Sequence, residues 1–295
     1  MATQRGWRQT LVQIMVYLNG DMLPIEEAKI SVLDRGFLLG DGIYEVIPAY
    51  GGKLFRFQQH LDRLQSSLDA VRIPNPHNTD EWQAILQHLV DENGTDDQSV
   101  YLQVTRGVAA KRDHTFPHDV SPTVFAMSNP IPPVSNDILE QGVSAITLDD
   151  IRWKRCDIKA ITLLANVILK QEAYDAGAVE AILIKDGYAL EGAASNLFIV
   201  QNNVIVTQPK GPQLLPGVTR DLVLELAAKH GLDYQERSIQ EQELHSADEV
   251  WLTSSTKEIL PVSQLNDSPV GDGNPGPVWK KISEMYRQYK VELRG

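Results

Sequence analysis

The stretch Arg152-Trp153-Lys154-Arg155-Cys156-Asp157-Ile158-Lys159 sets one lysine next to apolar residues, just ahead of a helix-forming segment. Three later motifs complement it: Glu191-Gly192-Ala193-Ala194-Ser195-Asn196, Leu215-Pro216-Gly217-Val218-Thr219-Arg220 and Thr253-Ser254-Ser255-Thr256. Each motif alone is a weak signal. In this order they predict one pocket that contains an amine, a carboxylate and two anion-binding turns.

Lys159 is the candidate amine. Burial among apolar neighbours favours the uncharged form of a lysine, and that form is the one that makes a Schiff base. The alternative from this stretch alone is a lysine at the edge of the core, in an ion pair with Asp157 or Glu191.

Glu191 is the candidate carboxylate, because the small residues after it allow a planar ligand to approach closely. A carboxylate held against a pyridine nitrogen keeps that nitrogen protonated and makes the ring an electron sink. The alternative is a turn glutamate in solvent.

A phosphate site is predicted where Gly217-Val218-Thr219 opens a helix, since free N–H groups and a hydroxyl gather there. An ordinary threonine N-cap is the alternative for Thr219. The turn at Ser254 and Ser255 offers more donors. Arg63 could also reach a phosphate, or it could be a surface ion-pair partner. An amine, a carboxylate and a phosphate site are the parts that a pyridoxal 5'-phosphate enzyme needs.

The polar loop over residues 107–118 carries Arg112 and His114. An arginine and a histidine two residues apart can bind a carboxylate, the arginine in bidentate fashion. The alternative is a solvated loop charge. His114 and His118 have a possible metal spacing but lack a third ligand nearby, so no metal site is expected.

The amino-acid composition argues against several classes of function. The chain has 295 residues and a net charge of -12, which argues against binding to nucleic acid or to an anionic membrane surface. No run approaches the ~20 apolar residues of a membrane span. The one cysteine, Cys156, permits no intrachain disulfide and fits a cytoplasmic location; we expect it to be a small buried residue rather than a nucleophile.

Local patterns predict two domains. An N-terminal extension over 1–14 precedes a small domain over 15–130, a proline-rich linker over 131–137 and a large domain over 138–295. The expected strands cover 15–18, 100–106, 123–127, 142–148, 181–184, 196–200, 204–207 and 249–253, with a hairpin at Gly51-Gly52. The expected helices cover 57–71, 82–93, 162–176, 219–230 and 279–292.

Together the motifs resemble the fold-type IV pyridoxal 5'-phosphate enzymes, and within that group they are most similar to the D-amino acid aminotransferases. The resemblance covers residues 15 to 290 and includes Asp34-Arg35-Gly36, Gly40-Asp41-Gly42-Ile43-Tyr44-Glu45, His60-Leu61-Asp62-Arg63-Leu64 and Val104-Thr105-Arg106-Gly107 besides the motifs above. It implies a mixed α+β and α/β fold: a small N-terminal α/β domain, a larger C-terminal domain with a β-barrel-like core, and the cofactor at the interface.

The resemblance also implies roles. Lys159 would be the Schiff-base lysine and the acid/base, and Glu191 would pair with the pyridine nitrogen. Further cofactor-binding residues would be Arg63, Ser195, Asn196, Leu215, Val218, Thr219, Ser254 and Ser255. The substrate carboxylate would be bound by Tyr44, Arg112 and His114, with the last two from the neighbouring subunit of a homodimer.

The implied reaction is a ping-pong transfer of the amino group between D-amino acids such as D-alanine and 2-oxo acids such as 2-oxoglutarate. Branched-chain L-amino acid or (R)-amine transaminases and aminodeoxychorismate-type lyases share the cofactor site and remain alternatives, as does a pyridoxal phosphate carrier without catalysis. The loop before Arg112 departs from the pattern of the resembled family by one extra residue, so Lys111 could shift or replace Arg112 in the carboxylate contact.

Overall fold

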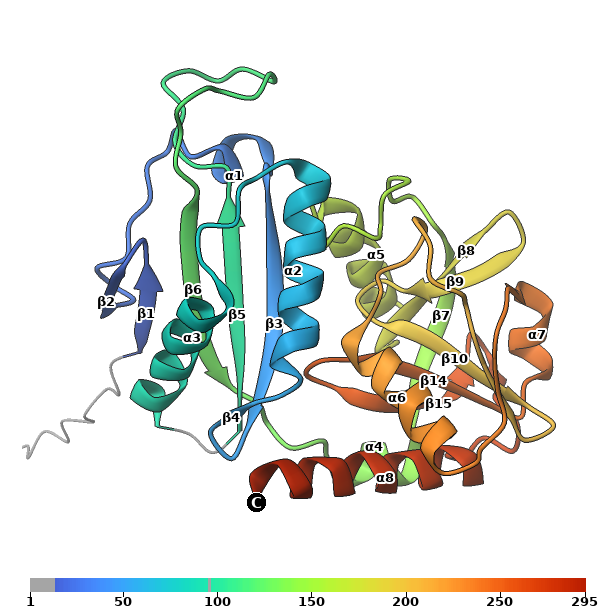
Figure 1. Ribbon diagram of the computed structural model, residues 1–295. Coiled ribbons are helices and arrows are strands. Elements are labelled where there is room, and N and C mark those ends of the chain that lie inside the picture. The colour runs from blue at the N-terminus through green and yellow to red at the C-terminus, as the bar shows by residue number, and fades with distance from the viewer. Residues whose placement is uncertain (1–13, 95–96) are drawn as a thin grey trace, which may run out of the picture.

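The computed structural model describes residues 14–94 and 97–295, which form two bodies lying side by side (Figure 1). An open six-stranded sheet organises the first body, and a larger sheet organises the second. The extension expected over residues 1–14 lies outside the described residues, apart from Ile14. Within the described ranges, no helix is both long and apolar enough to cross a membrane.

The first sheet is antiparallel throughout, in the order β2-β1-β6-β5-β3-β4. Its strands are β1 (Met15–Leu18), β2 (Asp21–Pro24), β3 (Gly42–Tyr50), β4 (Lys53–Leu54), β5 (Asp97–Thr105) and β6 (Thr123–Pro130). A short helix, α1 (Arg35–Leu39), precedes β3, while α2 (Phe57–Val71) and α3 (Thr79–Asn93) cover one face (Figure 1). The predicted hairpin at Gly51-Gly52 joins β3 to β4.

The core of the first body lies between this sheet and its two long helices. Alternate residues of a strand point to the same face, and helical residues three or four apart share a side. Side chains that meet in the core include Ile43, Ile47, Val100, Leu102, Leu64 and Leu68. The helix predicted from Trp82 begins earlier, at Thr79, because Asn78 and Glu81 form a capping box that the apolar spacing does not reveal.

The second sheet runs in the order β12-β11-β10-β14-β15-β7-β8-β9-β13, with β16 beside β15. Its strands are β7 (Val143–Asp149), β8 (Glu180–Lys185), β9 (Tyr188–Gly192), β10 (Asn196–Gln201), β11 (Val204–Thr207), β12 (Tyr234–Glu236), β13 (Ile239–Gln240), β14 (Glu249–Ser254), β15 (Glu258–Leu265) and β16 (Ser268–Pro269). A further pairing between β9 and β10 closes the strands from β10 round to β9 into a ring. The expected β-barrel-like core is therefore confirmed.

One strand beside the predicted site was missed. The sequence was expected to pass from the strand at 181–184 through a turn to the strand at 196–200, but β9 lies between them. Glu191 is thus part of a strand rather than of the connection between two strands. The short segment Tyr188–Gly192 has no strong alternation, and its strand character comes from pairing with β8, β10 and β13.

The helices of the second body are α4 (Asn136–Gln141), α5 (Leu164–Asp175), α6 (Val218–Lys229), α7 (Glu241–Ser246) and α8 (Pro277–Arg294). The C-terminal helix α8 runs beneath both bodies (Figure 1), and Arg294 near its end forms an ion pair with Asp97 of β5. The domain boundary at 131–137 stays a prediction; β6 and β7 on either side of it belong to different sheets.

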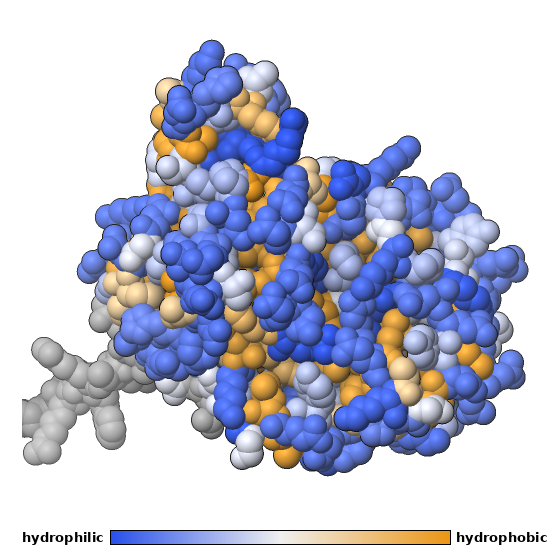
Figure 2. All heavy atoms as spheres, viewed as in Figure 1, coloured by the Kyte–Doolittle hydropathy of each residue, from blue (hydrophilic) through white to orange (hydrophobic). Residues whose placement is uncertain are grey.

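The loop between β5 and β6 projects beyond the end of the first sheet (Figure 1). Hydrophilic residues cover most of the face shown in Figure 2, and hydrophobic residues gather on this loop and at its base. Val108 and Phe116, which belong to this loop, are 45% and 42% exposed.

Candidate active site

A cavity of about 1010 Å³ is lined by residues of both bodies, from β3 and α2 on one side and from β9, β10, β14 and α6 on the other. All of the residues predicted to bind the cofactor line it: Lys159, Arg63, Glu191, Ser195, Asn196, Leu215, Val218, Thr219, Ser254 and Ser255. These residues span almost two hundred positions of sequence, and the fold brings them to one place. Their individual roles stay predictions.

Lys159 lies in the segment between β7 and α5, and its backbone is fixed against the first body. Its carbonyl accepts from the N–H of Tyr44 at 2.9 Å, and its own N–H donates to Ser67 Oγ at 3.2 Å. Its Nζ lies 4.1 Å from the centre of the Tyr44 ring and makes no hydrogen bond to a described residue. Burial, assisted by the positive charge of Arg63, lowers the pKa of Lys159 to about 7. The amine is therefore unpaired and readily uncharged.

Glu191 is held on several sides. Arg152 Nη1 lies 2.5 Å from Oε1, Asn196 Nδ2 donates to Oε2 at 3.1 Å, and the N–H of Leu215 donates to both oxygens. Burial raises the pKa of Glu191, and the Arg152 charge opposes that rise. The ring closure sets part of this geometry, because Asn196 and Glu191 are the paired residues of β10 and β9.

Sequence reasoning gave Arg152 no role. Its guanidinium also binds both oxygens of Asp150, each at 2.9 Å, so it stands between two carboxylates. The sequence signal for an ion pair of Arg152 was its position two residues after Asp150. It did not identify Glu191 as the second partner, because that contact crosses 39 positions of sequence.

Arg63 is not a surface ion-pair partner, since its side chain is buried and reaches the cavity. Its Nη2 and Nε donate to the carboxylate of Glu45 at 2.7 and 2.8 Å, and Nη1 donates to the carbonyl of Pro216 at 3.0 Å. His60 Nδ1 lies 2.9 Å from the same carboxylate. Burial alone would raise the pKa of Glu45, but Arg63 and His60 outweigh burial and hold it well below its usual range. Neither Glu45 nor His60 was predicted as a site residue.

The predicted anion site lies at the start of α6. The N-cap is Gly217, with no side-chain cap, so Thr219 is the second residue of the helix and the alternative of a threonine N-cap is wrong. The N–H groups of Val218 and Thr219 make no bond to a described residue, as expected in a first helical turn. Nearby on β14, Thr253 Oγ1 is buried and has no partner among the described residues. A Cβ at Gly217 would lie 1.9 Å from Asn196 Oδ1, so the N-cap position of α6 requires glycine.

The three residues predicted to bind the substrate carboxylate do not meet within one chain. Tyr44 lines the cavity, whereas Arg112 and His114 are exposed on the projecting loop and do not line it. Lys111 is also directed to solvent, 3.7 Å from Asp113. Ser195 lines the cavity, but its hydroxyl donates to Glu180 at 3.2 Å. No cluster of three metal-ligating side chains occurs among the described residues.

Comparison with known proteins decides the family. The model of the amino-transferase class IV family matches residues 42–265. The chain belongs to the class IV aminotransferases. It is 43% identical to the D-alanine aminotransferase of Bacillus licheniformis over 90% of this chain and 94% of that protein. It is 36% identical to the D-alanine aminotransferase of Listeria monocytogenes serotype 4b over 95% of this chain and 97% of that protein.

Solved structures of the class IV family share the whole architecture. A branched-chain amino acid aminotransferase of Escherichia coli superposes with a TM-score of 0.87 and 27% identity, covering 94% of each chain. The branched-chain amino acid aminotransferase of T.th., solved with pyridoxamine 5'-phosphate, superposes with a TM-score of 0.87 and 28% identity over the same shares.

Class IV aminotransferases depend on pyridoxal phosphate, and the residues of the cavity fit that group. Lys159 offers an unpaired amine, and Glu191 offers a carboxylate held by Arg152. The open N–H groups of α6 and the unpartnered hydroxyl of Thr253 offer donors for a phosphate. The amine, the carboxylate and the N–H and hydroxyl donors therefore match the aldehyde, the pyridine nitrogen and the phosphate of the cofactor, in that order.

Proposed function

We propose that the protein is a D-amino acid transaminase that moves the amino group between D-amino acids such as D-alanine and 2-oxo acids such as 2-oxoglutarate. The observation that carries a transaminase is the unpaired Lys159 amine in one cavity with the fixed carboxylate of Glu191. The choice of D-amino acids is supported by relatives of that activity at 36–43% identity and by the Arg112 and His114 pair.

Pyridoxal phosphate, when bound, supplies an electron sink that stabilises a carbanion at the substrate Cα. Lys159 Nζ would bind the cofactor covalently and then, as a free amine, move the proton at the substrate Cα. A pKa near neutrality suits that exchange, because both forms of the amine are then accessible. Glu191 would keep the pyridine nitrogen protonated, with Arg152 and Asn196 holding its orientation.

The other cavity residues would bind and orient. The N–H groups of Val218 and Thr219, with Ser254, Ser255 and Arg63, would hold the phosphate. Leu215 would back the ring, and its N–H already anchors Glu191. Asn196 would hold Glu191 and the Leu215 carbonyl, to which it donates at 2.8 Å. Ser195 would contribute from the edge of the cavity.

We propose that the active form is a homodimer in the cytoplasm. Tyr44 would bind the substrate carboxylate together with Arg112 and His114 of a second copy. The support is that both residues belong to the loop that projects beyond the first sheet (Figure 1), and that neither lines the cavity of its own chain. Arg112 and His114 would supply the cationic donors that bind a carboxylate beside Tyr44.

A branched-chain amino acid transaminase is the second candidate. It is supported by the solved structures at 27–28% identity, whereas the relatives named for D-alanine are more similar in sequence. An aminodeoxychorismate-type lyase would not need the carboxylate pair, so Arg112→Ala would leave a lyase largely active and would cripple the transaminase.

The test is a half-reaction. The purified yellow protein is mixed separately with D-alanine, L-leucine and (R)-1-phenylethylamine, and the loss of cofactor absorbance is followed. Bleaching by D-alanine alone supports the proposal. Bleaching by L-leucine or by the amine instead would replace it with the second candidate or with an amine transaminase.

A further inference from the structure

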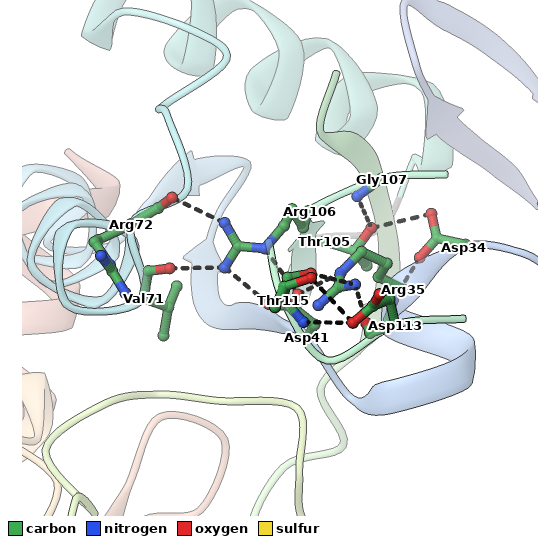
Figure 3. A network of polar contacts seen from close by, with 11 residues as sticks. Asp34, Arg35, Asp41, Val71, Arg72, Thr105, Arg106, Gly107, Asp113 and Thr115 are labelled. Carbon is green, nitrogen blue, oxygen red and sulfur yellow. Dashed lines mark hydrogen bonds and ion pairs between the residues drawn. The ribbon is translucent and has the colours of Figure 1, made fainter. Parts of the chain in front are cut away.

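We propose that Arg35 is a positioning residue for the carboxylate-binding pair, because it fixes the backbone on both sides of His114. The proposal rests on the proposed function for the purpose of the loop. Its physical basis is a network of hydrogen bonds and ion pairs at the base of the projecting loop (Figure 3). None of the residues labelled in this network lines the cavity.

The central contacts run from a buried side chain to an exposed loop. Arg35 is 3% exposed, and its Nη1 donates to the carbonyl of Asp113 at 2.6 Å and to that of Thr115 at 3.3 Å. These two carbonyls flank His114, and Asp113 follows Arg112 directly. The Asp113 carboxylate in turn accepts from the N–H and the hydroxyl of Thr115, both at 3.0 Å. The segment that carries Arg112 and His114 is therefore held at its backbone.

Arg35 is itself held rigidly. Its Nε lies 2.7 Å from Asp41, and Arg106 binds the same carboxylate at 2.8 and 3.0 Å. Asp41 stands between α1 and β3, three residues before Tyr44. One carboxylate thus links the turn that leads to Tyr44, inside this chain's cavity, to the loop that we assign to the cavity of a second copy.

Arg35 and Arg106 also contact the base of the loop. The N–H of Arg35 donates to the Gly107 carbonyl at 2.9 Å. Gly107 adopts a φ of +100°, and a Cβ there would lie 1.9 Å from the Ser121 carbonyl oxygen, so the two ends of the loop approach each other closely. Farther out, the guanidinium of Arg106 lies 3.7 Å from the centre of the Phe116 ring, which anchors an otherwise exposed aromatic residue.

The loop carbonyls do not depend on Arg35 for a hydrogen-bond donor. The carbonyls of Asp113 and Thr115 belong to a loop at the surface, where water can satisfy them. A guanidinium can bind a carboxylate and two carbonyls at once, because its donors form a planar fork, and a lysine ammonium cannot reach all three positions. The contacts with Arg35 instead order the loop before the ligand binds, so that less conformational entropy is lost on binding.

The test compares Arg35→Lys with Arg56→Lys in the full-length holoenzyme. Arg56 is a matched control, because it is also a buried arginine in a bidentate ion pair, with Glu225 at 2.6 and 2.7 Å, and it contacts no residue of the loop. Two quantities are measured: KM and kcat for D-alanine, and the rate of trypsin cleavage after Lys111 and Arg112. For Arg35→Lys we expect a rise in KM of about tenfold with kcat nearly unchanged, as for lost uniform binding, and faster cleavage. Arg56→Lys should change neither.

Wild-type KM and wild-type cleavage in Arg35→Lys would overturn the proposal, and so would equal effects in both variants, which would indicate a general loss of stability. If Arg35→Lys does not fold, Phe116→Ala replaces it, since Phe116 is exposed and packs on Arg106, which shares the Asp41 carboxylate with Arg35. Its cleavage should also be faster, and an unchanged rate would overturn the proposal. If the wild-type protein does not react with D-alanine, the proposed function fails, and the cleavage comparison still decides whether Arg35 holds the loop.

Discussion

Arg152 and Glu191 are joined by an ion pair of 2.5 Å that connects the segment after β7 to the strand β9. Arg152 is held in turn by Asp150, and Glu191 by Asn196 and the N–H of Leu215. The carboxylate that we assign to the pyridine nitrogen therefore has a fixed position before any ligand binds. Fixed positioning of charged groups is what electrostatic stabilisation in an active site requires.

Replacing Glu191 by glutamine should keep the cofactor bound but slow the half-reaction with D-alanine by about 10²-fold or more, because the charge that sustains the electron sink is lost. Stopped-flow absorbance measures the rate. Glu225→Gln is the control, because Glu225 is an exposed carboxylate that pairs with Arg56 outside the cavity. A variant as fast as wild type would show that Glu191 is not the partner of the pyridine nitrogen.

The substitution Lys159→Ala tests the covalent attachment. Borohydride reduction should leave the cofactor attached to Lys159 of the wild-type chain, with a mass gain equal to the cofactor less one water plus two hydrogens. It should add nothing to the variant, since no other amine takes the place of Lys159. Peptide mass spectrometry locates the label. Recovery of the label at Lys257, which also lines the cavity, would show that the amine was assigned to the wrong residue.

The pKa of Lys159, lowered to about 7, predicts a pH profile for capture of the cofactor. The uncharged amine is the nucleophile, so capture by the cofactor-free protein should be fast above about pH 7 and should slow as pH falls through that value. The rate of appearance of the yellow colour measures it between acid and alkaline pH. A midpoint close to the ordinary pKa of lysine, about 10.4, would contradict the burial argument.

Replacing Glu45 by alanine should destabilise the protein by about 3–5 kcal/mol, because Arg63 would be left buried without its counter-charge. The pKa of Glu45 is held below its usual range, so its stabilising effect is present above the unfolded pKa of about 4.3 and is lost as pH falls through the folded value. Urea unfolding at pH 7 measures the change. Glu284→Ala, in an exposed pair with Arg287, should leave the midpoint unchanged.

Mixing two inactive variants tests whether the carboxylate pair acts between subunits. Lys159→Ala and Arg112→Ala should each be nearly inactive alone. After random subunit exchange, half of the dimers are hybrids with one intact site each, so activity should return to about a quarter of wild type. If Arg112 served the cavity of its own chain, no mixture would regain activity.

Local sequence was sufficient for most of the elements. The spacing of Leu61, Leu64 and Leu68 predicted α2 with its exact bounds, because one helical face packs on a sheet and must be apolar. The two glycines at 51 and 52 predicted a hairpin for a similarly local reason. The order of the motifs also predicted the residues that line the cavity, since the family resemblance carries their long-range arrangement with it.

The tertiary structure alone decided the contacts between charges. Glu45 and Arg63 become a buried pair only when α2 lies on β3, and Arg152 finds Glu191 only when the ring of strands closes. The strand β9 exists because neighbouring strands pair with it, which its own five residues do not encode. The loop that carries Arg112 and His114 likewise has no local signal for its direction. The physical reason is shared: local patterns fix backbone shape over a few residues, whereas desolvated ion pairs and strand closure depend on which distant surfaces the whole fold brings together.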